Sequence, residues 1–110
     1  MDRFSAYRVM WILVFFDLPT ETKQERKAAA DFRKHLLGDG FTMFQFSIYV
    51  RHCASRENAD VHIRRLRAAL PKHGQVGSLV ITDKQFAGIE LFNCQKAVPP
   101  SAPGQQLEMF

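Results

Sequence analysis

The hydrophobic and polar positions of this chain fall into blocks with different periods. An unbroken apolar run from Trp11 to Phe16 predicts a strand over residues 9–17, buried on both faces, because β-branched and aromatic residues are frequent in it. The strand ends at Asp17, directly before a turn that contains Pro19. A carboxylate at the end of a buried strand is therefore the first candidate for chemistry.

Two later segments have the period of amphipathic helices. Apolar residues recur on one face over residues 22–37 and again over residues 55–70, which predicts a helix in each. The first helix begins at Thr22, which starts a capping box, and Gly38-Asp39-Gly40 ends it, since a glycine is free to adopt a left-handed conformation. Ser55 is expected to cap the second helix.

The rest of the pattern predicts extended structure. Residues 41–53 alternate in polarity, residues 75–82 fit a strand, and after a link over residues 83–88 a short strand fits residues 89–93. This order favours an α+β fold built as a two-layer sandwich. The ferredoxin-like order β-α-β-β-α-β requires residues 41–53 to bend into two strands. No Gly or Pro marks such a bend, so the pattern leaves both orders open.

Composition adds a few limits. We expect one domain over residues 1–94 and a flexible Pro-rich tail over residues 95–110. The net charge of +4 mildly favours a polyanionic partner. Residues 9–16 are too few to span a bilayer, so no membrane role is expected. Cys53 and Cys94 form neither a disulfide framework nor a zinc set, which is typical of a cytoplasmic protein.

Three motifs occur together in this chain. They are a strand that ends in Asp17, an Arg26-Lys27 pair in the first helix, and the Gln45-x-Ser47 sequence in the second extended segment. The set resembles the small CRISPR-associated adaptation nucleases, the second of the two near-universal CRISPR proteins and the partner of the CRISPR integrase. The resemblance covers about residues 9–92, and the sequence LVITDKQFAGIELF is similar to the branch that accompanies single-effector, type II systems.

The resemblance implies a ferredoxin-like fold, an antiparallel sheet with two helices, and a homodimer. It implies that two copies of Asp17 face each other across the dimer axis and share Mg²⁺. It also implies a role in spacer acquisition with the integrase and protospacer duplex DNA, and metal-dependent nuclease activity in some members. Phe16 departs from the pattern, because many relatives carry Tyr there and a hydroxyl near the metal would be missing.

Each candidate site residue also has a purely structural interpretation. Asp17 is either a catalytic, metal-holding carboxylate or a cap for the following turn. Gln45 and Ser47 share a face if their strand is regular, and they support either the dimer or a neighbouring element. The candidates for phosphate contacts with duplex DNA, which are otherwise a solvated helix surface, are Arg26, Lys27, Arg64, Arg65 and Arg67.

Three hypotheses for the function follow. In the first, the protein is an adaptor: a dimer that binds duplex DNA, bridges the integrase and cleaves nothing, with residues 106–110 adding as a strand to the integrase. In the second, it is a Mg²⁺-dependent phosphodiesterase that acts on RNA or DNA through paired Asp17. In the third, it is a ferredoxin-like RNA-binding or regulatory module outside CRISPR.

Overall fold

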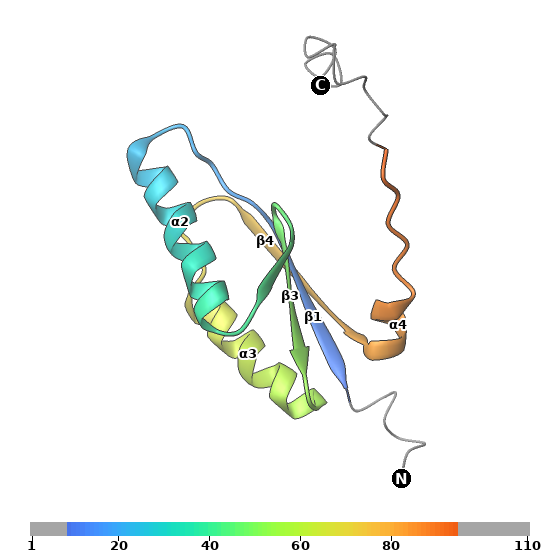
Figure 1. Ribbon diagram of the computed structural model, residues 1–110. Coiled ribbons are helices and arrows are strands. Elements are labelled where there is room, and N and C mark those ends of the chain that lie inside the picture. The colour runs from blue at the N-terminus through green and yellow to red at the C-terminus, as the bar shows by residue number, and fades with distance from the viewer. Residues whose placement is uncertain (1–8, 95–110) are drawn as a thin grey trace.

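Four strands and three helices lie along residues 9–94, the part of the chain that the computed structural model describes (Figure 1). The elements are β1 (Met10–Asp17), α2 (Lys23–Gly38), β2 (Thr42–Gln45), β3 (Ile48–Cys53), α3 (Arg56–Ala68), β4 (Gln75–Thr82) and α4 (Asp83–Ala87). Up to the end of β4 this order is β-α-β-β-α-β, which is the ferredoxin-like order.

The four strands form one antiparallel sheet in the order β2-β3-β1-β4. β1 lies in the middle of the sheet, where Leu13 is opposite Val50 of β3 on one side and Leu79 of β4 on the other. The predicted α+β fold with an antiparallel sheet is therefore confirmed. Asp17, at the end of β1, is opposite Gln75, the first residue of β4.

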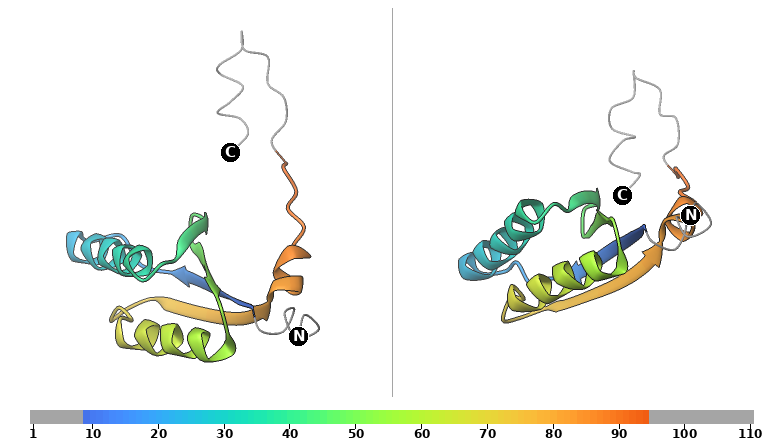
Figure 2. Two further views of the ribbon diagram at one scale, coloured as in Figure 1. Left: turned by 60° about the horizontal axis from the view of Figure 1, so that its bottom comes forward. Right: turned by 90° about the horizontal axis from the view of Figure 1, so that it is seen from below.

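Both long helices cover the same face of the sheet, as two further views show (Figure 2). Successive residues of a strand point to opposite faces, and in β1 the buried set Ile12, Val14 and Phe16 points toward the helices. These side chains pack with Phe32 and Leu36 of α2 in one core. Burying a side chain of this size stabilises the fold by about 1.5–3 kcal/mol, so this one face supplies most of the apolar packing.

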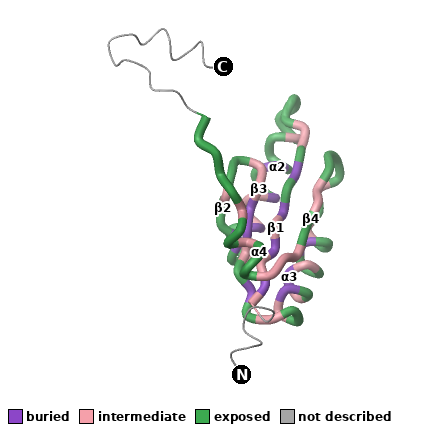
Figure 3. The backbone as a smooth tube through the Cα atoms, turned by 90° about the vertical axis from the view of Figure 1, so that its right-hand side faces the viewer, coloured by how far each residue is buried: buried purple, intermediate pink, exposed green. Residues whose placement is uncertain are grey.

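The opposite face of the sheet is only partly covered (Figure 3). We call it the open face, and its apolar residues are Trp11, Leu13, Phe15, Ile48, Val50, Leu79 and Ile81. Phe15 and Leu79 are exposed, so the prediction that β1 is buried on both faces was wrong. Within residues 9–94, Val50 is buried on this face, whereas the side chains of Phe15 and Leu79 are left uncovered.

The helix α4 covers one end of the open face. The ring of Phe86 stacks on that of Trp11 with centroids 3.9 Å apart, and Nε1 of Trp11 donates a hydrogen bond of 2.6 Å to Oδ1 of Asp83. The edge of the Trp11 ring meets His52 at a centroid distance of 5.0 Å. These contacts attach the chain that follows β4 to the beginning of β1.

The predicted helix caps are confirmed. Thr22 Oγ1 accepts a hydrogen bond from Glu25 N, and the Glu25 carboxylate accepts one from Thr22 N, which makes a capping box. The backbone hydrogen bond from Thr22 lowers the pKa of Glu25 most. Ser55 caps α3 by accepting from Asn58 N, and Gly40 has a φ of +89° just after α2.

Residues 41–53, for which the sequence pattern left one or two strands open, form two strands, because the chain reverses at Phe46 and Ser47. The predicted strand over residues 89–93 was wrong. Residues 89–93 belong to no strand, and the link before them contains α4, which begins at a second capping box between Thr82 and Gln85. The predicted tail over residues 95–110 lies outside the described residues. Within residues 9–94, no helix is long and apolar enough to cross a membrane.

Candidate functional site

Asp17 is an exposed side chain at the end of β1. It borders a hollow of about 700 Å³, which we call the Asp17 hollow. The hollow is lined by Phe15, Phe16, Asp17, Ser47, Ile48, Gly74, Gln75, Val76 and Gly77. It therefore joins the end of β1, the β2–β3 turn and the beginning of β4, three segments that lie far apart in the sequence.

Two glycines allow β4 to approach β1 closely at this hollow. Gly74 has a φ of +96°, and a Cβ there would lie 2.7 Å from the carbonyl oxygen of Asp17. Gly77 lies under the ring of Phe15, which a Cβ at that position would meet. Because any side chain would push the segments apart, these glycines fix the position of Asp17 relative to β4.

The structure separates the predicted pair Gln45 and Ser47. Ser47 lines the Asp17 hollow, and its carbonyl oxygen accepts a hydrogen bond of 3.1 Å from the backbone N–H of Phe16. Gln45 is the exposed last residue of β2 and does not line the hollow. The two residues were expected on one face of a regular strand, but a turn begins between them. Ser47 is thus the nearer of the two to Asp17.

Sequence reasoning missed Gln75 at this site. It faces Asp17 directly across the β1–β4 pair, and both side chains are exposed at the Asp17 hollow. Directly opposed residues in an antiparallel pair have Cβ atoms about 4.5–5.5 Å apart. Only the register of β1 against β4 identifies this neighbour, and nothing in the sequence gives that register.

Phe16 lies on the other side of the sheet from Asp17. Its ring is buried and meets the ring of Phe32 edge-on, with centroids 5.2 Å apart. Neighbouring residues in a strand point to opposite faces. Phe16 borders the Asp17 hollow, but its ring points into the core on the helix side of the sheet.

The groups around the hollow fit Mg²⁺ in part. The side chains of Asp17, Ser47 and Gln75 offer oxygen atoms, which are the donors that Mg²⁺ prefers. Among the described residues, no group of three or more His, Cys, Asp or Glu gathers as a metal site. One chain thus supplies a single carboxylate here, and a second copy of Asp17 would have to supply another.

The two candidate residues on α2, Arg26 and Lys27, have local partners. Nη1 of Arg26 donates to the carbonyl oxygens of Thr20 and Glu21, at 3.1 and 3.0 Å. Nζ of Lys27 pairs with Asp31 at 3.0 Å on the exposed surface. Arg26 therefore holds the turn before α2, while the Lys27 pair is accessible and weak.

The basic residues of α3 differ from one another. Arg64 and Arg67 are exposed and have no ion pair among the described residues. Nη1 of Arg65 lies 2.8 Å from Oδ1 of Asp39, at the end of α2. The sequence places no acid among these arginines, and the fold brings one to them. Of the three candidate arginines on this helix, Arg64 and Arg67 are thus the two without an ion pair in the described chain.

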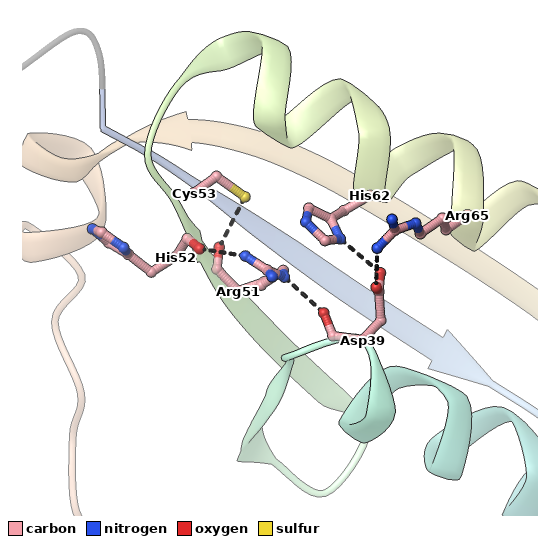
Figure 4. A network of polar contacts seen from close by, with 6 residues as sticks. All are labelled: Asp39, Arg51, His52, Cys53, His62 and Arg65. Carbon is pink, nitrogen blue, oxygen red and sulfur yellow. Dashed lines mark hydrogen bonds and ion pairs between the residues drawn. The ribbon is translucent and has the colours of Figure 1, made fainter.

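Asp39 is the centre of a polar network between α2, β3 and α3 (Figure 4). Oδ2 lies 2.7 Å from Nδ1 of the buried His62, and the carbonyl oxygen accepts a hydrogen bond of 2.7 Å from Nε of Arg51. Burial acts to raise the pKa of Asp39, but the hydrogen bonds from His62 and Arg65 outweigh it and lower the pKa. The network joins the helices and is not part of the Asp17 hollow.

The chain is similar to known proteins over most of its length. Residues 10–89 match the family model described as CRISPR associated protein Cas2. The CRISPR-associated endoribonuclease Cas2 of Flavobacterium psychrophilum is 63% identical over 108 residues, which are 98% of this chain and 94% of that protein. Proteins with the same name from Parvibaculum lavamentivorans and Paracidovorax avenae are 52% identical over 101 residues and 42% identical over 106 residues. Those alignments cover 92% and 96% of this chain, and 100% and 98% of the two relatives.

Proposed function

Because the chain belongs to the Cas2 family of CRISPR-associated proteins, we propose that it acts in spacer acquisition, as a dimer that binds protospacer DNA and bridges copies of the CRISPR integrase. The observation that carries this proposal is the family match over residues 10–89, which contain every element from β1 to α4. The family match overturns the alternative of a regulatory or RNA-binding module outside CRISPR. We extend the proposal to a type II system, which the genes beside this one would test.

The open face supports the dimer. A sheet that is apolar on both faces is stable in water only when both faces are covered. Here Phe15 and Leu79 are exposed at the centre of the open face, and Ile48 lies beside them in β3. A second copy that packs on this face would cover these side chains. It would also bring the two Asp17 hollows toward each other, because Asp17 points to the same face as Phe15.

Residues 89–93 also support association. Leu91 and Phe92 are exposed, yet the sequence of this segment favours a strand. A segment that forms a strand only by pairing stays irregular when its partner strand is on another chain. β4 is an edge strand in the described sheet, so its outer side is free to pair. We propose that residues 89–93 pair with another chain.

The exposed cations of α3 support binding to DNA. Arg64 and Arg67 are exposed, and they share α3 with Arg65 near its C-terminal end. Such residues contact phosphates without reading sequence, and their contribution to affinity falls as the salt concentration rises. The net charge of +4 agrees with a polyanionic partner.

A second candidate function is phosphodiester hydrolysis. The most similar relatives named above are called endoribonucleases, and we transfer this activity to the present chain only as a proposal. When bound, Mg²⁺ supplies charge neutralisation at a scissile phosphate and a more acidic water. Asp17 would hold the ion, while Ser47 and Gln75 are close enough to orient water or a phosphate oxygen in the hollow.

The experiment uses Asp17→Ala, with Asp60→Ala on the exposed surface of α3 as a control. In cells that lack the native gene, we expect Asp17→Ala to restore spacer acquisition as well as the wild type does. With purified protein and Mg²⁺, we expect the same variant to abolish any cleavage of labelled duplex DNA or single-stranded RNA that EDTA also abolishes.

Each arm of the experiment has its own contrary result. Loss of spacer acquisition in Asp17→Ala, but not in Asp60→Ala, would contradict the view that the protein acts as an adaptor alone. Cleavage that survives Asp17→Ala would contradict the proposal that the paired carboxylates catalyse it. Failure of the wild type itself to restore acquisition would contradict the proposed function.

A further inference from the structure

Arg33 of α2 lies between two aromatic rings. Its guanidinium carbon is 4.7 Å from the ring centroid of Phe46, in the β2–β3 turn, and 5.5 Å from that of Phe16, in β1. Cations are attracted to the faces of aromatic rings at such distances. The two rings therefore restrict the guanidinium to one place, although α2, β1 and the turn come from different parts of the sequence.

The charge of Arg33 has no counterion within residues 9–94. Its Nε is buried and has no hydrogen-bond partner among the described residues, and none of the ion pairs found there includes Arg33. Arginine stays protonated in proteins, so this is a permanent charge. Since a buried donor without a partner is rare and costs free energy, the site calls for an anionic acceptor.

Phe46 is the second unusual feature of this place. It is 73% exposed, and it belongs to the same turn as Ser47, which lines the Asp17 hollow. The turn is tied to β1 by the hydrogen bond from Phe16 N to the carbonyl oxygen of Ser47. The Arg33–Phe46 pair therefore lies at the same end of the sheet as Asp17, on the helix side.

The chemistry of the pair favours a phosphate. With aromatic rings against it, a planar guanidinium still presents N–H groups along its edge, and these match the oxygens of a phosphate. An exposed aromatic ring beside such a cation is a surface on which a base can stack. We propose that Arg33 is a phosphate-binding residue for nucleic acid and that Phe46 positions it; this rests on the proposed nucleic-acid binding and adds a residue to it.

Lys34 provides a matched control, because it is exposed and neighbours Arg33 on α2. Fluorescence anisotropy with a labelled duplex and a labelled single strand measures Kd over a series of salt concentrations. We expect Arg33→Gln to raise Kd about tenfold, because it removes one charge-assisted hydrogen bond. The slope of log Kd against log salt should fall by about one. Lys34→Gln removes the same charge and should raise Kd less than about threefold.

A substitution in the ring tests the positioning role. Phe46→Leu should raise Kd about threefold without changing the salt slope, because it keeps the charge and loses the ring that holds the guanidinium. Phe46→Tyr, which keeps a ring, should bind as the wild type does. Thermal melting of each variant checks that the fold persists.

The Nε–Hε signal of Arg33 in ¹⁵N NMR spectra gives a direct readout. We expect it to shift on addition of a short oligonucleotide, while the Nε–Hε signal of the exposed Arg56 stays in place. An unmoved Arg33 signal, or equal effects of Arg33→Gln and Lys34→Gln, would overturn the inference and leave the proposed function standing. A wild-type protein that binds neither oligonucleotide would overturn both.

Discussion

At the residue scale, Asp39 connects three elements of this small fold. It ends α2, its carboxylate accepts hydrogen bonds from His62 and Arg65 of α3, and its backbone carbonyl accepts one from Arg51 of β3. Its side chain is only 10% exposed, so water cannot replace these bonds if they are lost. A buried acceptor that loses its charge leaves its donors unsatisfied, and the cost falls on the contact between the two helices.

We predict that Asp39→Asn lowers the free energy of unfolding at pH 7 by about 1.5–3 kcal/mol, the range for hydrogen bonds to charged groups. The pKa of Asp39 is lowered in the folded state, so its stabilisation is fully present above the unfolded pKa and is lost as the pH falls through the folded value. The difference between the wild type and the variant should therefore begin to shrink at about pH 4 and disappear only below the lowered folded pKa of Asp39. Urea unfolding over a pH series measures the difference.

The exposed pair of Lys27 and Asp31 provides the comparison for this experiment. Asp31→Asn should change the free energy of unfolding by less than about 0.5 kcal/mol, as expected for an exposed helix pair. If Asp39→Asn proved as mild as Asp31→Asn, or if its effect persisted at acidic pH, the network would not stabilise the fold as described.

At the scale of elements, helices were predictable and one turn was not. The apolar stripes and caps of α2 and α3 are local in sequence, and both helices begin within about one residue of the prediction. The reversal at Phe46 and Ser47 contains no glycine or proline, and no non-glycine residue in the described chain has a positive φ. Turn chemistry therefore gave no signal, and pairing between β2 and β3 decides the bend.

The candidate site likewise contains residues that the sequence could identify and residues that only the fold brings to it. Asp17 was predictable because a carboxylate at the end of an apolar strand is a local feature. Gln75 and Arg33 were not singled out, because their neighbours come from β1 and from the β2–β3 turn. The predicted strand over residues 89–93 failed in the described chain because strand propensity is realised only by pairing, and this segment pairs with no strand there.

The element α4 gives a prediction that fluorescence can test. The chain has one tryptophan, Trp11, and its ring stacks on Phe86. Phe86→Ala should shift the emission to longer wavelength and lower the free energy of unfolding by about 0.5–1.5 kcal/mol beyond the loss of buried area, the worth of an aromatic pair. Lys84→Ala, on the exposed side of α4, should leave the emission unchanged. An unshifted emission in Phe86→Ala would mean that α4 does not cover Trp11 in solution.

At the scale of the whole molecule, one face of the sheet is covered by helices and the other is covered only in part. The helices cover one side, and α4 covers only the Trp11 end of the other. The described fold is also thin, since its apolar core lies in a single layer between the sheet and two helices. The open face is thus an apolar surface that the arrangement of elements leaves for another protein.

The proposed dimer can be tested with two matched leucines. Leu79 on the open face is 53% exposed, and Leu37 on α2 is 54% exposed. We expect Leu79→Glu to dissociate the dimer, because it would bury two charges in an apolar contact, and Leu37→Glu to leave it intact. Sedimentation velocity at micromolar concentration measures the oligomeric state. A wild-type monomer, or a dimer that tolerates Leu79→Glu, would contradict association through this face.

The position of β1 in the sheet has a consequence for biosynthesis. β1 is made first, yet both of its neighbours, β3 and β4, come from later parts of the chain. Contacts between residues distant in sequence form slowly, and an apolar strand is prone to aggregate until it pairs with its neighbouring strands. The apolar run at the start of the described chain therefore emerges from the ribosome well before its partners. Slower translation of the β4 region would lengthen the time for which β1 is unpaired and would lower the yield of folded protein.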